Sequence, residues 1–288
     1  MSGPIPAAPP ATSRGGAARP LLMGVLNVTP DSFSDGGRFA ELDAAVAQAQ
    51  ALIAAGAEVL DLGGESTRPG AEPVAEAVEL ERVLPVIAAI RGFSDVPISI
   101  DTRKPGVARA AVMAGAGMWN DITALEGAPD SLGTAAALQV PVVLMHMQGR
   151  PETMQDDPRY TDPVGEVLAY LLGRAEAAMA AGVRREHIWL DPGIGFGKAL
   201  EHNLALLANL DRLTATGFPV LLGVSRKRTV RYIDPTAIDP NDRIGGSLAM
   251  ALQGSAQGVA ALRVHDVRET AQALAVQMAI RQAPRWRP

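Results

Sequence analysis

One pattern repeats eight times along this chain: a short aliphatic or β-branched run ends in polar or glycine residues, and an alanine-rich stretch follows. The runs are residues 21–29, 58–64, 97–101, 118–123, 142–147, 187–193, 219–225 and 259–265. Strands that alternate with helices imply a parallel sheet, because parallel neighbours need crossover connections. Eight such units in about 260 residues predict an α/β fold, the closed (β/α)8 TIM barrel. An open, doubly wound sheet is the alternative.

Local signals predict where several helices begin and end. Pro163 follows Asp162, which is typical of a helix that starts at the proline. Asp266 stands three residues before Glu269, a spacing that predicts a capping box. Four glycines follow helical stretches, and we expect left-handed helix ends at Gly56, Gly115, Gly182 and Gly217. Leucines at helical spacing predict one apolar face through Leu200, Leu204, Leu207 and Leu210.

The first 20 residues differ in composition from the rest, because they are mostly Pro, Ala and Gly. They contain no apolar core of a secretory signal. We therefore expect a disordered tail over residues 1–20 and a single barrel domain over residues 21–288. The length of 288 residues would allow two domains, but barrels of this class use about 250 residues as one.

The composition excludes several kinds of site and partner. The chain has no cysteine, so disulfides, iron–sulfur clusters, thiolate zinc sites and a cysteine nucleophile are excluded. A reducing compartment fits this composition, and we expect a cytoplasmic location. The net charge of −5 argues against nucleic-acid or anionic-membrane partners. No apolar run approaches the roughly 18 residues of a membrane span.

Polar or ionisable residues stand at the carboxyl end of every predicted strand, which is where barrels of this class hold their active sites. They are Asn27, Glu65, Thr67, Arg68, Asp101, Asn120, Asp121, His146, Asp191, Ser225, Lys227, Arg263 and His265. Alternate residues share a strand face, so Ser225 is expected to face with Lys227, and Arg263 with His265. Such charges would converge on one cavity that suits a polar heterocycle and an anion. Solvated strand ends are the alternative.

Two kinds of loop stand out beside these residues. Residues 191–198 read DPGIGFGK, which has neither the Walker nor the dinucleotide-binding spacing. We interpret this segment as a tight turn that lets backbone approach a flat ligand, with a plain β–α turn as the alternative. Residues 27–37 and 67–70 are expected to be lids or binding loops, with mobile rim segments as the alternative.

The four histidines do not predict a zinc site. His146 and His265 stand at strand ends, whereas His187 and His202 are expected to be structural. Any divalent ion would be Mg²⁺ that is bound by oxygens and shared with a phosphate. A Ser–His–Asp triad through Ser225 and His265 lacks the G-x-S-x-G motif that would support it.

Eight ordered motifs, one for each predicted strand, give the sequence a specific resemblance. They are MGVLNVTPDSFSDGG (23–37), DLGGESTRPG (61–70), IDTRKP (100–105), NDI (120–122), LMHMQ (144–148), LDPGIGFGK (190–198), GVSRK (223–227) and RVHDV (263–267). The chain resembles the dihydropteroate synthase family, pterin-binding TIM barrels that sulfonamides target. The resemblance covers residues 21 to about 280. Two positions depart from the usual pattern, namely Trp119 before Asn120 and Arg228 after Lys227.

The resemblance implies a transferase that joins 6-hydroxymethyl-7,8-dihydropterin pyrophosphate to 4-aminobenzoate. The products are 7,8-dihydropteroate, for folate biosynthesis, and pyrophosphate. A dissociative course is expected, in which pyrophosphate leaves and the amine then attacks the methylene carbon. The resemblance also implies Mg²⁺ as cofactor, the two small molecules as partners, a homodimer, and loop closure that excludes water.

Residue roles follow from the same resemblance. Pterin-binding residues would be Asp101, Asn120, Met145, Asp191, Gly195, Lys227 and Arg263. Pyrophosphate would be bound by Asn27, Arg263 and His265, with Asn27 also the Mg²⁺ ligand. The aminobenzoate would contact Thr67, Arg68, Pro69, Phe196 and Ser225, under a closing loop that contains Phe33 and Asp35. The residues expected to be catalytic are Asn27, Asp101, Lys227, Arg263 and His265.

Two other functions are alternatives. A methyltransferase barrel that passes a methyl group from methyltetrahydrofolate to a corrinoid protein would share the pterin pocket. It would not need residues 67–70 or the Ser225–Lys227 triplet in this form. A non-catalytic, pterin-binding relative would be favoured by loss of Asn27, Asp101 or Lys227, and all three are present.

Overall fold

The computed structural model describes residues 19–28, 37–66, 72–151 and 153–284. Eight parallel strands form one sheet in the order β6-β5-β4-β3-β2-β1-β8-β7. They are β1 (Leu21–Asn27), β2 (Val59–Gly63), β3 (Ile98–Asp101), β4 (Met118–Asp121), β5 (Val142–Met145), β6 (Ile188–Asp191), β7 (Leu221–Gly223) and β8 (Ala261–Val264). A parallel bridge between Leu190 and Val220 joins the two ends of the sheet. The predicted (β/α)8 barrel is therefore confirmed, and the open sheet is not.

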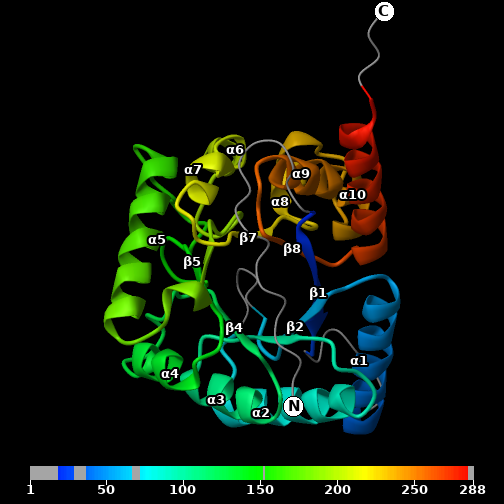
Figure 1. Cartoon of the computed structure of the whole chain (residues 1–288), viewed down its shortest axis with the longest axis vertical. Helices are drawn as coiled ribbons and strands as arrows, with labels where there is room; N and C mark the ends of the chain where they lie inside the picture. Colours follow the sequence, from blue (N-terminus) through cyan, green and yellow to red (C-terminus); the bar gives the residue numbers. More distant parts are fainter. Residues whose placement is uncertain (1–18, 29–36, 67–71, 152, 285–288) are drawn as a thin grey trace, which may run out of the picture.

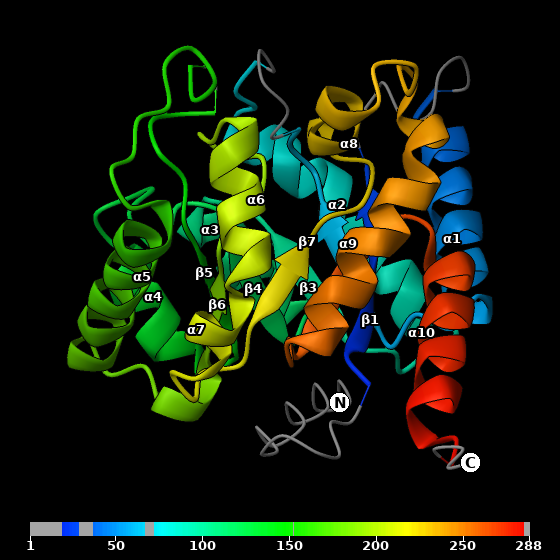
Figure 2. The same cartoon turned by 90° about the horizontal axis from the view of Figure 1, so that it is seen from above.

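Helices form a ring around the strands in the view of Figure 1, and Figure 2, turned by 90°, shows the helices running alongside the strands. They are α1 (Gly37–Ala54), α2 (Glu76–Arg91), α3 (Pro105–Met113), α4 (Ser131–Leu138), α5 (Pro163–Ala180), α6 (Leu200–Ala208), α7 (Leu210–Thr214), α8 (Arg228–Ile233), α9 (Ile244–Ala256) and α10 (Val267–Gln282). Short 3-10 helices cover Arg185–His187 and Pro240–Arg243. No helix in the described part of the chain is long and apolar enough to cross a membrane.

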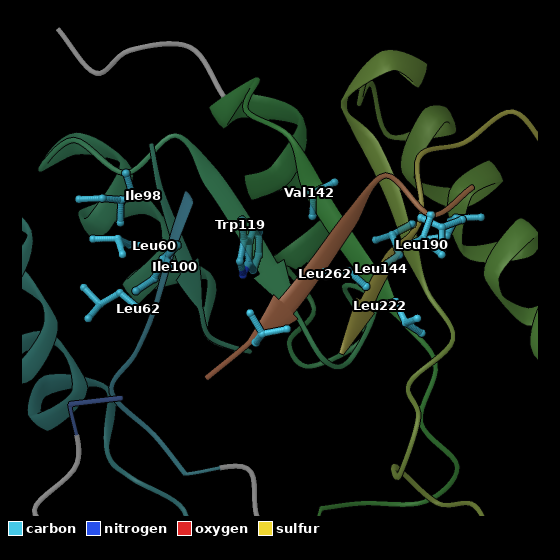
Figure 3. Close-up of a cluster of buried hydrophobic side chains, with 14 of the residues drawn as sticks. Leu60, Leu62, Ile98, Ile100, Trp119, Val142, Leu144, Leu190, Leu222 and Leu262 are labelled. Carbon is cyan, nitrogen blue, oxygen red and sulfur yellow. The ribbon is translucent and has the colours of Figure 1, made fainter. Parts of the chain in front are cut away.

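The outward face of the strands packs against the helices and forms the main hydrophobic core. Figure 3 shows part of this layer, with Leu60, Leu62, Ile98 and Ile100 at one side and Leu144, Leu190 and Leu222 at the other. Trp119, Val142 and Leu262 are also labelled, and all ten side chains are buried. Burial of each large aliphatic side chain contributes about 1.5–3 kcal/mol. Trp119, one of the two departures noted above, lies in this layer and donates from Nε1 to the Thr102 carbonyl at 2.7 Å. The other, Arg228, is exposed at the start of α8.

The inward face changes from apolar to polar along the barrel axis. A second cluster, which contains Met23, Val59, Met118, Val143, Trp189, Leu221 and Ala261, fills the amino-terminal end. Two residues further along the strands, the same face carries Asp61, Asp101, Asn120, Asp191 and Arg263. This follows from the two-residue period of a strand. This apolar cluster fills the amino-terminal end of the barrel, so the polar side chains of the interior lie at the carboxyl ends of the strands.

Two of the local predictions are confirmed. Helix α5 begins at Pro163, and the Asp162 side chain accepts from the Gly165 amide. The four predicted left-handed glycines have φ of +101°, +118°, +105° and +77° at Gly56, Gly115, Gly182 and Gly217. The tail expected over residues 1–20 lies outside the described residues except for its last two. Of these, Arg19 donates to Glu58 at 2.8 Å.

Three local predictions are wrong. Asp266 precedes α10 but makes no capping bond, because its carboxylate pairs with Arg226 instead. The helix through Leu200 stops at Ala208, and Leu204 is 42% exposed, so the four leucines do not share one buried face. Ser225 and Lys227 do not share a strand face, because β7 ends at Gly223.

Candidate active site

A network of four side chains from four strands crosses the carboxyl end of the barrel. Arg263 on β8 donates from Nε to Asp61 Oδ2 at 2.5 Å and from Nη2 to Asp101 Oδ2 at 2.7 Å. Asn120 on β4 donates to the same Asp61 oxygen at 3.2 Å. The strand register explains this convergence, because Gly63 pairs with Asp101, and Asp101 with Asn120. The guanidinium is thereby held flat over the barrel interior.

Beside this network lies a small cavity of about 30 Å³. Its lining includes Asp101, Asn120, Met145, Asp191, Lys227 and Arg263. The Lys227 ammonium also lies 4.5 Å from the centre of the Phe196 ring. A wider groove of about 1140 Å³ shares the lining residue Ile122 with the cavity. The cavity thus joins carboxylates, cations, an amide, a thioether and an aromatic ring, a set that suits a flat, polar ligand.

Burial and mutual charge set the protonation of these groups. Burial raises the pKa of Asp101 to about 7, and Arg263 acts in the opposite direction. Burial also raises the pKa of Asp191, against a backbone hydrogen bond and the charge of Lys227. The pKa of Lys227 falls to about 8 because of burial, with Asp191 opposing that fall. For Arg263, burial alone would lower the pKa, but Asp61 and Asp101 outweigh it and the pKa lies above its usual value. A ligand in this cavity would therefore contact several ionisable groups whose pKa values are shifted, which is typical of functional sites.

His265 and Ser225 meet at the rim next to Arg263. The Ser225 hydroxyl lies 3.1 Å from His265 Nδ1 and accepts from the His265 backbone amide at 3.2 Å. Burial lowers the pKa of His265 to about 3, with the nearby Arg263 and Arg226 adding to the effect. The imidazole is therefore neutral at physiological pH. The Ser225 hydroxyl also lies 3.5 Å from Asp266 Oδ2, but Nδ1 is the nearer acceptor. A hydroxyl that donates to Nδ1 leaves Nε2–H as a neutral donor.

The segment over residues 191–198 is the tight turn that was expected. Gly193, Gly195 and Gly197 all have positive φ, and a Cβ at Gly193 would lie 1.9 Å from the His146 carbonyl oxygen. Lys198 is 1% exposed and donates to the carbonyls of His146 at 3.2 Å and Phe196 at 3.0 Å. This buried amine ties the turn to the end of β5, and so fixes the Phe196 backbone.

Asn27 ends β1 on the inward face of the barrel. A Cβ at Gly63 would lie 3.6 Å from Asn27 Oδ1 and 3.7 Å from Asp101 Oδ2, so the glycine leaves space between these two oxygens. In the described part of the chain, no group of three or more His, Cys, Asp or Glu residues could hold a metal ion. An amide oxygen with one carboxylate nearby fits a Mg²⁺ ion that takes its other ligands from water and phosphate.

One residue expected at the carboxyl end of the barrel does not face the cavity. Asp121 faces outward and accepts from the backbone amides of Thr123 and Leu125, so its role is to hold a turn. The expected residues Phe33, Asp35, Thr67, Arg68 and Pro69 lie outside the described residues. Glu65 is described, and it accepts from Val74 N at 2.9 Å and pairs with Arg103 and Lys104.

The structure brings together Asn27, Asp101, Asn120, Met145, Asp191, Phe196, Ser225, Lys227, Arg263 and His265 at one end of the barrel. The sequence alone does not assign a role to Asp61, Lys198 or Arg226. In the structure Asp61 accepts from Arg263, Lys198 donates to the Phe196 carbonyl, and Arg226 pairs with Asp266, the residue after His265. For Asp61 a signal was available, because it lies on the same strand face as Val59 and Gly63. Lys198 and Arg226 act through contacts that are distant in sequence, and no local pattern marks them.

Comparison with known proteins agrees with this site. The family model described as "Pterin binding enzyme" matches residues 23–265. Dihydropteroate synthase of Escherichia coli (strain K12) is 47% identical over 259 residues, which cover 90% of this chain and 91% of that protein. The same enzyme from Synechocystis sp. is 46% identical over 255 residues, or 88% of each chain.

Solved structures of dihydropteroate synthases are also similar to this chain. Dihydropteroate synthase of Xanthomonas albilineans with 4-aminobenzoic acid is 48% identical with a TM-score of 0.87, and the match covers 92% of this chain and 94% of that one. The Yersinia pestis enzyme in complex with a sulfonamide drug is 45% identical with a TM-score of 0.86, over 94% and 99% of the two chains. On this evidence the chain belongs to the dihydropteroate synthases, a family of pterin-binding enzymes.

Proposed function

We propose that this chain condenses 6-hydroxymethyl-7,8-dihydropterin pyrophosphate with 4-aminobenzoate to give 7,8-dihydropteroate and pyrophosphate. The observation that carries the proposal is the convergence of Asp101, Asn120, Asp191, Lys227 and Arg263 on one cavity. One related structure, from Xanthomonas albilineans, is described as a complex with 7,8-dihydropteroate. It is 45% identical to this chain, with a TM-score of 0.83 over 92% and 95% of the two chains.

The pterin ring would bind among the residues that line the small cavity. Its 2-aminopyrimidinone edge presents adjacent N–H groups, which the Asp191 carboxylate would accept. The ring carbonyl needs a donor, which the Lys227 ammonium would supply. Asp101 and Asn120 would bond the remaining polar edge, while Met145 and the Gly195 backbone pack against the ring. Each neutral hydrogen bond of this kind is worth about 1 kcal/mol net, and those to charged groups more.

Departure of pyrophosphate is the step that these residues would accelerate. The C–O bond at the pterin methylene breaks, the electron pair leaves with pyrophosphate, and the electron-rich pterin shares the cation. Arg263, the neutral His265 Nε2–H and the Asn27 amide would bind the growing negative charge. A preorganised donor of this kind is worth roughly 3–4 kcal/mol in the transition state. The aryl amine then attacks the methylene carbon, so the reaction needs no enzyme nucleophile.

Asn27 and the oxygen-lined space beside Gly63 would hold Mg²⁺ together with the substrate's phosphate oxygens. The ion would neutralise charge on the leaving group. Arg263 and His265 would bind the phosphate oxygens from their own side of the barrel. Removal of Mg²⁺ with a chelator is expected to weaken pterin pyrophosphate binding more than binding of the pterin alcohol, which lacks the phosphates.

The aminobenzoate would stack on Phe196 and place its carboxylate near Ser225. Thr67, Arg68 and Pro69 are proposed to complete this subsite, and Phe33 and Asp35 to belong to the segment that closes over it. We extend the proposal to a single barrel domain over residues 21–288 in the cytoplasm, as the composition suggests, and to a homodimer, as the family resemblance implies. Sedimentation of the purified chain tests the dimer.

Incubation of the purified chain with both substrates and Mg²⁺ tests the function. Dihydropteroate and pyrophosphate are expected in equal amounts, with Lys227→Ala at least 100-fold slower. The exposed Arg228→Ala serves as the matched control and should retain the wild-type rate. Absence of product above the Lys227→Ala level would refute the synthase function. Methyl transfer to a corrinoid would then point to the methyltransferase, and pterin binding alone to the non-catalytic relative.

A further inference from the structure

Arg226 has a backbone conformation that arginine rarely adopts. Its φ is +60°, in the left-handed region that favours glycine. The residue stands between Ser225 and Lys227, in the short turn from Gly223 at the end of β7 to α8. A left-handed residue reverses the chain locally, and this turn directs its two neighbours to different partners. Ser225 reaches His265, and Lys227 reaches the face of Phe196.

Both backbone polar groups of Arg226 are held from the start of α9. Its amide donates to Ser247 Oγ at 2.8 Å, and Ser247 Oγ donates in turn to the Arg243 carbonyl at 2.8 Å. The buried Arg243 guanidinium completes the circuit by donating from Nη1 to the Arg226 carbonyl at 3.0 Å. Strained backbone of this kind persists only where its surroundings over-determine it.

The side chain of Arg226 makes a second, independent anchor. Its Nε donates to Asp266 Oδ2 at 3.1 Å and its Nη2 to Asp266 Oδ1 at 2.6 Å, a two-point pairing of guanidinium with carboxylate. Asp266 directly follows His265, so the pair joins the turn after β7 to the end of β8. Asp266 gives up the capping bond to α10 that its position would allow. Glycine would relieve the backbone but could not make this connection.

We infer that Arg226 is a positioning residue, which holds the Ser225–His265 contact and the Lys227 side chain in register through its pair with Asp266. The pair thereby fixes the end of β7 relative to the end of β8. These two ends carry groups that are proposed to bind the aminobenzoate, the pterin and the leaving group. This role explains why an arginine occupies a position that suits glycine. The inference rests on the proposed function for its kinetic consequences, but its structural content does not depend on the substrates.

Arg226→Gly separates positioning from simple structural support. Glycine adopts the observed φ freely, so the thermal unfolding midpoint should fall by no more than a few degrees. The value of kcat/KM for aminobenzoate should fall roughly 10- to 100-fold, as small misplacements of site groups do. Arg226→Lys keeps the charge but loses the two-point pairing, and should not rescue the rate. Arg228→Ala, two positions away and exposed, should match the wild type.

Asp266→Asn weakens the same pair with the Arg226 backbone unchanged, and it also alters the 3.5 Å contact between Ser225 Oγ and Asp266 Oδ2. This variant stands in should the glycine variant fail to fold. It should show the same kinetic loss, and the double variant with Arg226→Gly should lose no more than the larger single loss. The ¹⁵N shift of His265 Nδ1 should change in both single variants without any substrate, because Ser225 is released. That readout holds even where the chain shows no synthase activity.

The inference is overturned by any of three results. The first is wild-type kinetics and an unchanged His265 shift in the two single variants. The second is an activity loss that merely follows the unfolded fraction. The third is additive losses in the double variant, which would mean that Arg226 and Asp266 act separately.

Discussion

Arg263 on β8 and Asp61 on β2, the two strands that flank β1, are joined by a 2.5 Å ion pair, and the Asp61 side chain is fully buried. Asp61 Oδ2 also accepts from Asn120, whereas Oδ1 has no hydrogen-bond partner among the described residues. Within the described part of the chain, only the Oδ2 oxygen of Asp61 is therefore hydrogen-bonded, and through it the carboxylate orients the Arg263 guanidinium toward the cavity. Asp61 pairs with Ser99, two residues before Asp101, so its carboxylate starts deeper in the barrel than that of Asp101.

Replacing Asp61 with Asn keeps the shape and removes the charge. Arg263 would keep Asp101 as its one carboxylate partner in the network, and its plane would no longer be fixed. We expect the free energy of unfolding to fall by about 3 kcal/mol, the lower end for a broken buried pair. The value of kcat/KM should fall about 100-fold. Denaturant unfolding and steady-state kinetics measure the two, with the exposed Asp43→Asn as control. Unchanged kinetics would contradict the supporting role.

The affinity for pterin pyrophosphate should fall at high pH because Lys227 loses its proton, which gives the pH profile a basic limb. The pKa of Lys227 is about 8 because burial disfavours the charged form. The charged ammonium is a much stronger donor to a ring carbonyl than the neutral amine, so deprotonation as pH rises through about 8 should weaken binding about tenfold per pH unit. Calorimetry of pterin pyrophosphate from pH 6.5 to 9.5 measures the limb, which Lys227→Met should abolish. A limb that survives in that variant belongs to another group.

His265 should stay neutral throughout the working range in the ligand-free protein. Burial and the neighbouring Arg263 hold its pKa at about 3. The ¹⁵N signals of its ring should therefore not titrate between pH 5 and 8. His265→Gln, which keeps a neutral donor, should retain more activity than His265→Ala. A midpoint near 6.5 in the ¹⁵N titration would show that the ring is exposed to solvent and charges freely.

Lys198 should make stability rise with pH. Burial lowers its folded-state pKa to about 7, below the unfolded value of about 10.4. Between these values the unfolded chain binds more protons, so this residue makes the free energy of unfolding increase with pH. The slope cannot exceed about 1.4 kcal/mol per pH unit for one proton. Lys198→Met should remove this contribution in denaturant unfolding from pH 7 to 9.5. Parallel curves for the two proteins would rule it out.

The barrel and most of its polar interior could be predicted because the necessary information is local. Eight apolar runs define eight strands, and the two-residue period then decides that Asp101 and Arg263 face inward while Trp119 faces the helices. Once the strands are parallel, their carboxyl ends meet without further information. Asn120 and Asp191 reach the cavity for the same reason, so their convergence follows from the pattern alone.

The errors arise where tertiary contacts override a local preference. Asp266 has the spacing of a helix cap, yet an arginine 40 positions away in sequence takes its carboxylate. Lys227 was expected on a strand face, but β7 ends early and the left-handed Arg226 directs it instead. The helix after Leu200 stops at Ala208, a break that the leucine spacing does not indicate. Partners that lie far apart in sequence leave no periodic signal.

The chemistry proposed for the rim is that pyrophosphate departs before the amine attacks. Positional isotope exchange tests it most directly, with ¹⁸O at the oxygen that joins the pterin methylene to phosphorus. With enzyme and Mg²⁺ but no aminobenzoate, the label should move to the non-bridging oxygens of that phosphate, as ³¹P NMR would detect, and Lys227→Ala should slow the exchange. A bridging label that stays in place, in a protein that forms dihydropteroate once aminobenzoate is added, would contradict the dissociative course.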